Sequence, residues 1–188
     1  MFKAKHPLAF LPVSFGLLVL VLSLFLVVIK TNSTSSQDSN VKASREPGAL
    51  SLSPSTETLN FKSGSYYSSG LVISSGDQAV KRVDVQVQFD PTLVMVDPQI
   101  NSGSVLDTTT LSQVDNRQGR IYLSAENNQA KKANGILASF RFQPLRSGLI
   151  KFSLQFNGAE AVDDSNIINS SGEDMLTSVA NGEYVVNP

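Results

Sequence analysis

Several residue types on which common protein chemistry depends are absent or scarce in this chain. Its 188 residues contain no cysteine and no tryptophan, and the single histidine, His6, lies close to the N-terminus. The lack of cysteine excludes disulfides, thiolate catalysis and cysteine-ligated zinc. Because no histidine follows His6, a Ser-His-Asp triad is excluded from the rest of the chain, and a histidine metal site nearly so.

An excess of charge of one sign is missing as well. The chain has 15 basic and 16 acidic residues, a formal net charge of -1, and no basic cluster stands out. Nucleic-acid-binding surfaces need a concentration of lysine and arginine that this sequence does not supply. We therefore expect no nucleic-acid partner.

One long apolar run is present near the N-terminus. Residues 8–29 are uncharged and mostly apolar, with Lys3 and Lys5 before them and Lys30 directly after. A transmembrane helix needs about 20 such residues, whereas a cleaved signal peptide has about 7–15 apolar residues and a small-residue cleavage site. No Ala-x-Ala pattern follows the run, so an uncleaved signal anchor in residues 1–30 is favoured over a cleaved signal peptide. The basic N-terminus predicts a single-pass cell-membrane protein with a cytoplasmic N-terminus and an extracytoplasmic domain.

The remainder of the chain divides into a linker and a β-rich domain. Residues 31–48 are rich in Ser, Thr and Asn without an apolar period, which is typical of a flexible linker. In residues 49–188, short apolar-polar alternations are separated by turn residues. About nine such strands predict an all-β, antiparallel sandwich. Residues 101–115 are expected to be a loop with a short strand near Val105 and Leu106.

The clearest strand begins at Val83 and ends at Phe89. Its period of two places Val83, Val85, Val87 and Phe89 on one face and Asp84, Gln86 and Gln88 on the other. Pro91 cannot donate a hydrogen bond to a neighbouring strand, so we expect the strand to end at the Asp90-Pro91 turn. A second apolar run, Leu93–Val96, follows directly.

Four segments, in order, resemble those of cohesin domains. The block from Val83 to Val96 is similar to the family pattern V-x-V-x-(F/Y)-D-P-x-x-L-x-V. Leu50–Ser55 resembles the opening strand, Ile121–Glu126 resembles a strand that ends in Ala-Glu, and Gly135–Phe142 with Ser147–Leu149 resembles the paired strands after it. The resemblance extends from Ala49 to about Val186.

The resemblance implies a fold and a function. The implied fold is an antiparallel, nine-stranded jelly-roll β-sandwich, related to the type 2/3 superfamily of carbohydrate-binding modules and preceded here by the transmembrane helix. Cohesins are non-catalytic and bind dockerin modules, which holds glycoside hydrolases or other proteins on a scaffold or cell surface. The expected function is therefore extracytoplasmic binding of a dockerin-like protein for surface attachment or scaffolding, linked to polysaccharide degradation.

In cohesins one sheet face receives the dockerin helix, and the alternation supplies candidate residues for that face. The candidates are Arg82, Asp84, Gln86 and Gln88 on one strand, Tyr122, Ser124 and Glu126 on a second, and Lys151 and Ser153 on a third. Asp84 matches a family aspartate of the binding face, and Glu126 matches the glutamate of the Ala-Glu motif. The alternative is that these residues form the solvated face of a half-buried sheet.

A carbohydrate-binding surface protein of the same superfamily is a rival hypothesis, and a structural envelope domain is a third. Glycan binding usually requires an aromatic platform, and only tyrosines are available. Tyr66 and Tyr67 are adjacent on a predicted strand, so they should point to opposite faces and cannot form one platform. Tyr122 is the tyrosine that the sequence places on the candidate face.

No cofactor is expected apart from a speculative calcium site. Asp163, Asp164 and Asn166 supply oxygen ligands of the kind that calcium prefers, but without the glycine and final glutamate of an EF-hand loop. A solvated acidic loop is the alternative. We expect no enzyme activity, because a flat sheet face carrying Asp84 and Glu126 lacks the cleft that raises the pKa of a catalytic acid.

Overall fold

The computed structural model describes residues 48–158, 161 and 163–188, which all belong to one compact unit. The predicted membrane anchor, residues 1–30, and all of the predicted linker except Gly48 lie outside the described residues. Within the described ranges, no helix is long and apolar enough to cross a membrane.

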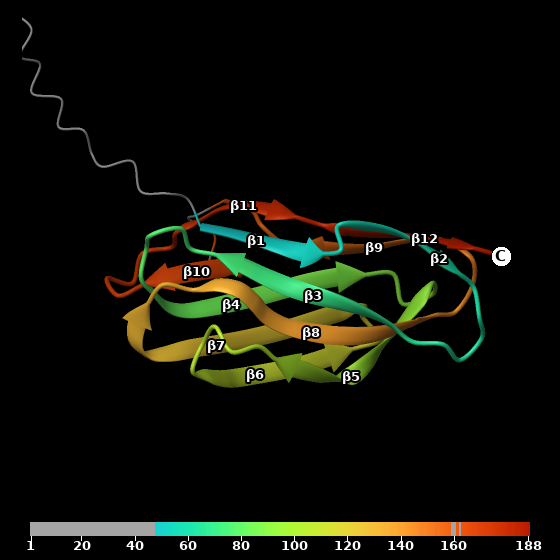
Figure 1. The fold of residues 1–188 in the computed structure, drawn as a ribbon, viewed down its shortest axis with the longest axis horizontal. Helices are drawn as coiled ribbons and strands as arrows, with labels where there is room; N and C mark the ends of the chain where they lie inside the picture. Colours follow the sequence, from blue (N-terminus) through green and yellow to red (C-terminus); the bar gives the residue numbers. More distant parts are fainter. Residues whose placement is uncertain (1–47, 159–160, 162) are drawn as a thin grey trace, which may run out of the picture. The chain divides into compact units, whose positions relative to one another are not determined.

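Two β-sheets form the two layers of a sandwich (Figure 1). The five-stranded sheet has the order β11 (Leu176–Ala180), β1 (Gly48–Ser53), β3 (Tyr67–Ser74), β8 (Asn134–Pro144) and β5 (Val94–Ser102). The seven-stranded sheet has the order β2 (Thr56–Asn60), β12 (Gly182–Asn187), β9 (Gly148–Leu154), β4 (Val80–Phe89), β7 (Arg120–Lys131) and β6 (Thr108–Asp115), with β10 (Asn166–Asn169) also paired to β4.

The predicted all-β sandwich is confirmed, and the described residues contain no helix. Most neighbouring strands are antiparallel, but β1 pairs with β11 and β2 pairs with β12 in parallel. Twelve strands are present in the described residues, where the resemblance implied nine. The difference comes mainly from short segments such as β10 and β11, which were not predicted because they are too short to show a clear alternation.

The position of one predicted strand and the end of another were wrong. The strand expected near Val105 and Leu106 is instead β6, which begins at Thr108 and lies in the predicted loop. Most β6 side chains are exposed because it is the last strand of its sheet, so its sequence lacks an apolar alternation. β7 continues to Lys131, well beyond the alternating run that Glu126 was expected to end.

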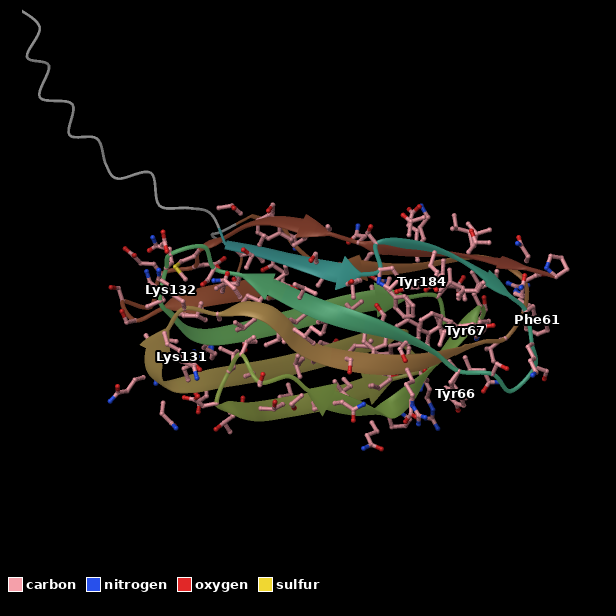
Figure 2. All side chains as sticks on the ribbon, in the orientation of Figure 1. Phe61, Tyr66, Tyr67, Lys131, Lys132 and Tyr184 are labelled. Carbon is pink, nitrogen blue, oxygen red and sulfur yellow. The ribbon has the colours of Figure 1, made fainter. Side chains whose placement is uncertain are left out.

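The core lies between the two sheets, and the inward row of β4 contributes to it as predicted. Val83, Val85, Val87 and Phe89 are all buried. Phe152 on β9 is the centre of an aromatic cluster, with ring centroids 5.8 Å from Phe89, 5.2 Å from Phe140, 5.1 Å from Phe142 and 5.9 Å from Tyr184. These rings come from both sheets, so the cluster holds the two layers together. Tyr184 is fully buried (Figure 2).

Two strands share one edge of β4. β9 pairs with the end of β4 near Phe89, and β10 pairs with its beginning near Arg82. Between them, the Gln86 backbone N–H donates to the Ser165 hydroxyl at 3.0 Å, and that hydroxyl donates to the Gln86 carbonyl at 3.3 Å. Ser165 therefore completes the hydrogen bonding of β4 where neither strand reaches it.

Candidate functional site

The strand register brings the nine predicted binding residues to the outer face of the seven-stranded sheet. Across β4 and β7, Arg82 lies opposite Glu126, Asp84 opposite Ser124, and Gln86 opposite Tyr122. On the other edge of β4, Gln88 lies opposite Ser153 of β9, and Lys151 is two residues away on the same face. All nine are partly or fully exposed, so we call this set the candidate face.

Asp84 is the most strongly engaged residue of the candidate face. One carboxylate oxygen lies 2.9 Å from Nε of Arg82, and the other accepts a hydrogen bond of 2.5 Å from the Ser124 hydroxyl. Both oxygens are thus satisfied within the domain, which orients the carboxylate before any partner arrives. Because Arg82 is half exposed, water screens this ion pair and its contribution to stability is small.

Two further contacts on the candidate face involve residues that the sequence interpretation missed. Nζ of Lys151 lies 2.7 Å from Glu183, its cross-strand neighbour on β12. Arg120 donates a hydrogen bond of 3.0 Å to the Tyr122 hydroxyl, and this contact raises the pKa of Arg120 above its usual value. Only the register could reveal Glu183 as the partner of Lys151, since the two are distant in sequence.

Some side chains of the candidate face are still available to a partner. Glu126 and Gln88 make no side-chain hydrogen bond or ion pair with another residue of the described ranges. Leu149 on β9 and Val185 on β12 are directly opposite each other and exposed, which adds an apolar area next to Lys151. The candidate face therefore combines oriented charges, free hydrogen-bonding groups and an apolar area.

Two shallow hollows meet at Gln88. The first has a volume of about 180 Å³ and is mainly polar, lined by Gln86, Val87, Gln88, Arg120, Tyr122, Gln155, Asn157 and Asp163. The second, of about 520 Å³, is lined by Gln88, Phe89, Asp90, Pro91, Leu93, Gln118, Leu149, Lys151 and Ser153. The first is partly enclosed but smaller than a typical ligand pocket, and the second is open, so the candidate face suits an extended protein surface better than a small molecule.

The three residues of the predicted calcium site are close in sequence, and the Asp164 carboxylate, the Asp163 backbone carbonyl and the Asn166 amide nitrogen have protein partners. The Asp164 carboxylate is buried and accepts hydrogen bonds from the Asn157 backbone N–H and, at 3.4 Å, from the Asn166 amide. The Asp163 carbonyl accepts from the Gln86 amide at 2.9 Å. In the part of the chain that the structure describes, no three acidic or histidine side chains are placed to share a metal ion. Calcium binding stays a prediction.

The tyrosines lie as their spacing predicted. Tyr67 packs against the buried ring of Phe142, with centroids 6.0 Å apart, and donates a hydrogen bond to the Asn60 carbonyl. Tyr66 points away from it and is exposed beside Arg141 (Figure 2). The two rings therefore do not form a common platform.

Comparisons with known proteins show the fold. No family model and no curated protein matches the chain. A type III cohesin module of the ScaE scaffoldin from Ruminococcus flavefaciens is 13% identical, with a TM-score of 0.62 over 80% of this chain and 93% of that one. A cohesin of ScaC from Acetivibrio cellulolyticus, solved in complex with the ScaB dockerin, is 16% identical, with a TM-score of 0.60 over 75% and 99%. A non-cellulosomal cohesin from Archaeoglobus fulgidus is 14% identical, with a TM-score of 0.57 over 76% and 92%.

These likenesses confirm the resemblance that the sequence motifs suggested. The described domain has a cohesin-like fold.

Proposed function

We propose that this protein is a non-catalytic module that binds a dockerin-like protein through the candidate face. The observation that carries the proposal is the cohesin-like fold, because several of the similar cohesins were solved in complex with dockerins. At such low identity the fold alone is shared, so the contacts must be argued from this chain's own residues. The partner's role would be attachment to a surface or scaffold, linked to polysaccharide degradation.

The candidate face supports this role by offering three kinds of contact. Glu126 can accept hydrogen bonds from hydroxyl, lysine or arginine groups of a partner helix, since no described residue occupies it. Tyr122 and the Leu149–Val185 pair supply apolar area, and tyrosine is a frequent hot-spot residue at interfaces. The Arg82–Asp84–Ser124 contacts hold neighbouring charges in place, which lowers the entropy lost on binding.

We further propose that residues 1–30 anchor the protein in the cell membrane, with the domain on the extracytoplasmic side. The support is the apolar run of residues 8–29 and the lysines before it. Fractionating cells and measuring the mass of the mature protein would test this. Recovery of a shortened chain in the soluble fraction would contradict it.

Binding is best tested with residues 45–188, which form a compact unit with its own core. The probes are purified dockerin modules, including the ScaB dockerin, measured by calorimetry. We expect at least one to bind, and Glu126→Lys to weaken binding about tenfold or more, as for a lost charged contact at an interface. Glu57→Lys, an exposed change on the edge strand β2, is the matched control and should have no effect.

The alternatives give different results in the same experiment. Failure of every dockerin would contradict the proposed partner. Binding to a polysaccharide panel, abolished by Tyr122→Ala, would support the glycan hypothesis instead. Equal binding by wild type and Glu126→Lys would leave the partner but contradict the proposed face.

A further inference from the structure

A second surface lies on the opposite side of the sandwich, on the outer face of the five-stranded sheet. Gln143 of β8 pairs with Met95 of β5 on one side. Since Tyr67 pairs with Phe142, extending that register by one residue places Tyr66 opposite Gln143 on the other side. Arg141 lies two residues before Gln143 on the same face of β8, and Leu145 lies two residues after it, directly past the end of the strand. We call Tyr66, Met95, Arg141, Gln143 and Leu145 the Gln143 patch.

The Gln143 patch is mainly apolar, and its one charged side chain, Arg141, is paired, while Gln143 itself is partly exposed. Tyr66, Met95 and Leu145 are 44%, 37% and 45% exposed, and they are three of the seven large hydrophobic residues that the described domain exposes most. The Arg141 guanidinium lies 5.2 Å from the centre of the Tyr66 ring and forms an ion pair with Asp97. Tyrosine, methionine and arginine are the residue types enriched at protein interfaces, and a clustered apolar area with a polar rim marks such a site.

We propose that the Gln143 patch is a two-fold contact between two copies of this chain. With the two-fold axis parallel to β8, Gln143 faces Gln143 of the second copy, and a carboxamide both donates and accepts hydrogen bonds, so it can pair with itself. Tyr66 and Met95 lie on opposite sides of β8, so the axis brings Tyr66 of one copy onto Met95 of the other. Methionine sulfur packs favourably against an aromatic ring.

A two-fold axis parallel to the strands is compatible with the proposed membrane anchor and with the candidate face. An axis parallel to the strands keeps the start of β1 at the same end of both copies (Figure 1), as the proposed membrane anchor on each chain requires. An axis across the strands would place the two Gly48 residues at opposite ends. The pairing also leaves both candidate faces exposed, so a dimer would present two partner sites and gain avidity.

The small size of the Gln143 patch implies a weak dimer in dilute solution. Stable interfaces bury about 800 Å² per partner, more than five side chains can supply. Confinement of both chains to one membrane raises their effective concentration and favours the contact.

Because the chain has no cysteine, a single cysteine introduced into residues 45–188 is the only site that a thiol-specific crosslinker can join. Packed sheets lie about 10 Å apart, too far for a disulfide, so a bismaleimide of matching length is the crosslinker. Gln143→Cys should form crosslinked dimers about ten times faster than Leu111→Cys, since effective concentration in a weak complex exceeds that in free solution. Leu111 lies on the other sheet and is more exposed than Gln143, so easier access of the reagent would favour the control rather than the proposed contact.

A mixture of two variants tests the direction of the axis. Tyr66→Cys mixed with Met95→Cys should crosslink several times faster than either variant alone. Faster self-crosslinking of Tyr66→Cys would overturn the proposed axis, and equal rates for Gln143→Cys and Leu111→Cys would overturn the contact itself.

Sedimentation velocity provides a measurement without crosslinker. Wild-type residues 45–188 should show a concentration-dependent monomer–dimer equilibrium, and Tyr66→Ser should lower the association constant about tenfold. Leu111→Ser should leave it unchanged. A wild-type fragment that stays monomeric at all concentrations would overturn the proposed dimer. Because the measurement contains no dockerin, its result is independent of the proposed dockerin binding.

Discussion

The outer faces of the two sheets differ in how their side chains are engaged. On the seven-stranded sheet, polar residues form contacts with one another, such as Asp84 with Arg82 and Ser124, and Lys151 with Glu183. On the five-stranded sheet, Gln143 is surrounded by exposed apolar side chains. The comparison shows that an outward polar row is not by itself a free binding surface, because part of it is used within the domain.

Phe152→Ala should have the largest effect, because both faces depend on the same core. Its ring contacts four other aromatic rings drawn from both sheets. We expect a loss of about 3–5 kcal/mol in the free energy of unfolding, from lost burial and the cavity that forms. Denaturant unfolding of residues 45–188 measures it, with Leu111→Ala as an exposed control. A loss similar to the control would show that the two layers are held together elsewhere.

Ser165→Ala should have a smaller effect that is confined to the seven-stranded sheet. The change leaves the partly buried Gln86 backbone N–H without its acceptor, and the loss should cost about 1 kcal/mol, at the low end of the range for an unsatisfied buried group. Hydrogen exchange at the Gln86 amide should accelerate, while amides of β3 and β8 exchange as before. Ser171→Ala, an exposed change in the loop after β10, is the control. Unchanged exchange at Gln86 would mean that water replaces the hydroxyl.

Asp84→Ala and Glu126→Ala separate the engaged part of the candidate face from its free part. Asp84 accepts from Ser124 and pairs with Arg82, so its loss should cost about 0.5–1 kcal/mol after allowance for solvent screening. Glu126→Ala should leave the unfolding free energy unchanged and weaken partner binding instead. Denaturant unfolding measures both variants. If Glu126→Ala lowers the free energy of unfolding as much as Asp84→Ala does, Glu126 is not a free residue of the candidate face.

The smallest expected effect is a pH dependence on the five-stranded sheet. The Gln99 backbone N–H and the Arg141 guanidinium lower the pKa of Asp97 below its ordinary value of 3.8. A carboxyl group with a lowered pKa in the folded state contributes stability above its unfolded pKa, and that contribution is lost as pH falls through the folded value. Stability should therefore fall below pH 3.8, and Asp97→Asn should reduce that dependence. Carboxyl NMR titration gives the pKa directly, and a value at or above 3.8 would contradict the assignment.

Sequence reasoning succeeded where a strand has neighbours on both edges and one face in the core. In β4, every second residue meets the core, so the alternation of Val83 to Phe89 predicts both the strand and its inward face. It failed for β6, whose mostly exposed side chains show no apolar period, and for β10 and β11, which are too short to show one. The cohesin-like motifs extended the prediction from a fold class to a particular fold.

The sequence by itself determined which side chains of β4, β7 and β9 point outward, because a period of two is a local property of each strand. Only the tertiary structure decided what those side chains meet. The contacts between Lys151 and Glu183, between Asp84 and Ser124, and of Ser165 with β4 join residues far apart in the chain. Their proximity depends on strand order and register, which arise from packing both sheets on one core rather than from any local pattern. The same packing placed Tyr66 and Met95 on either side of Gln143.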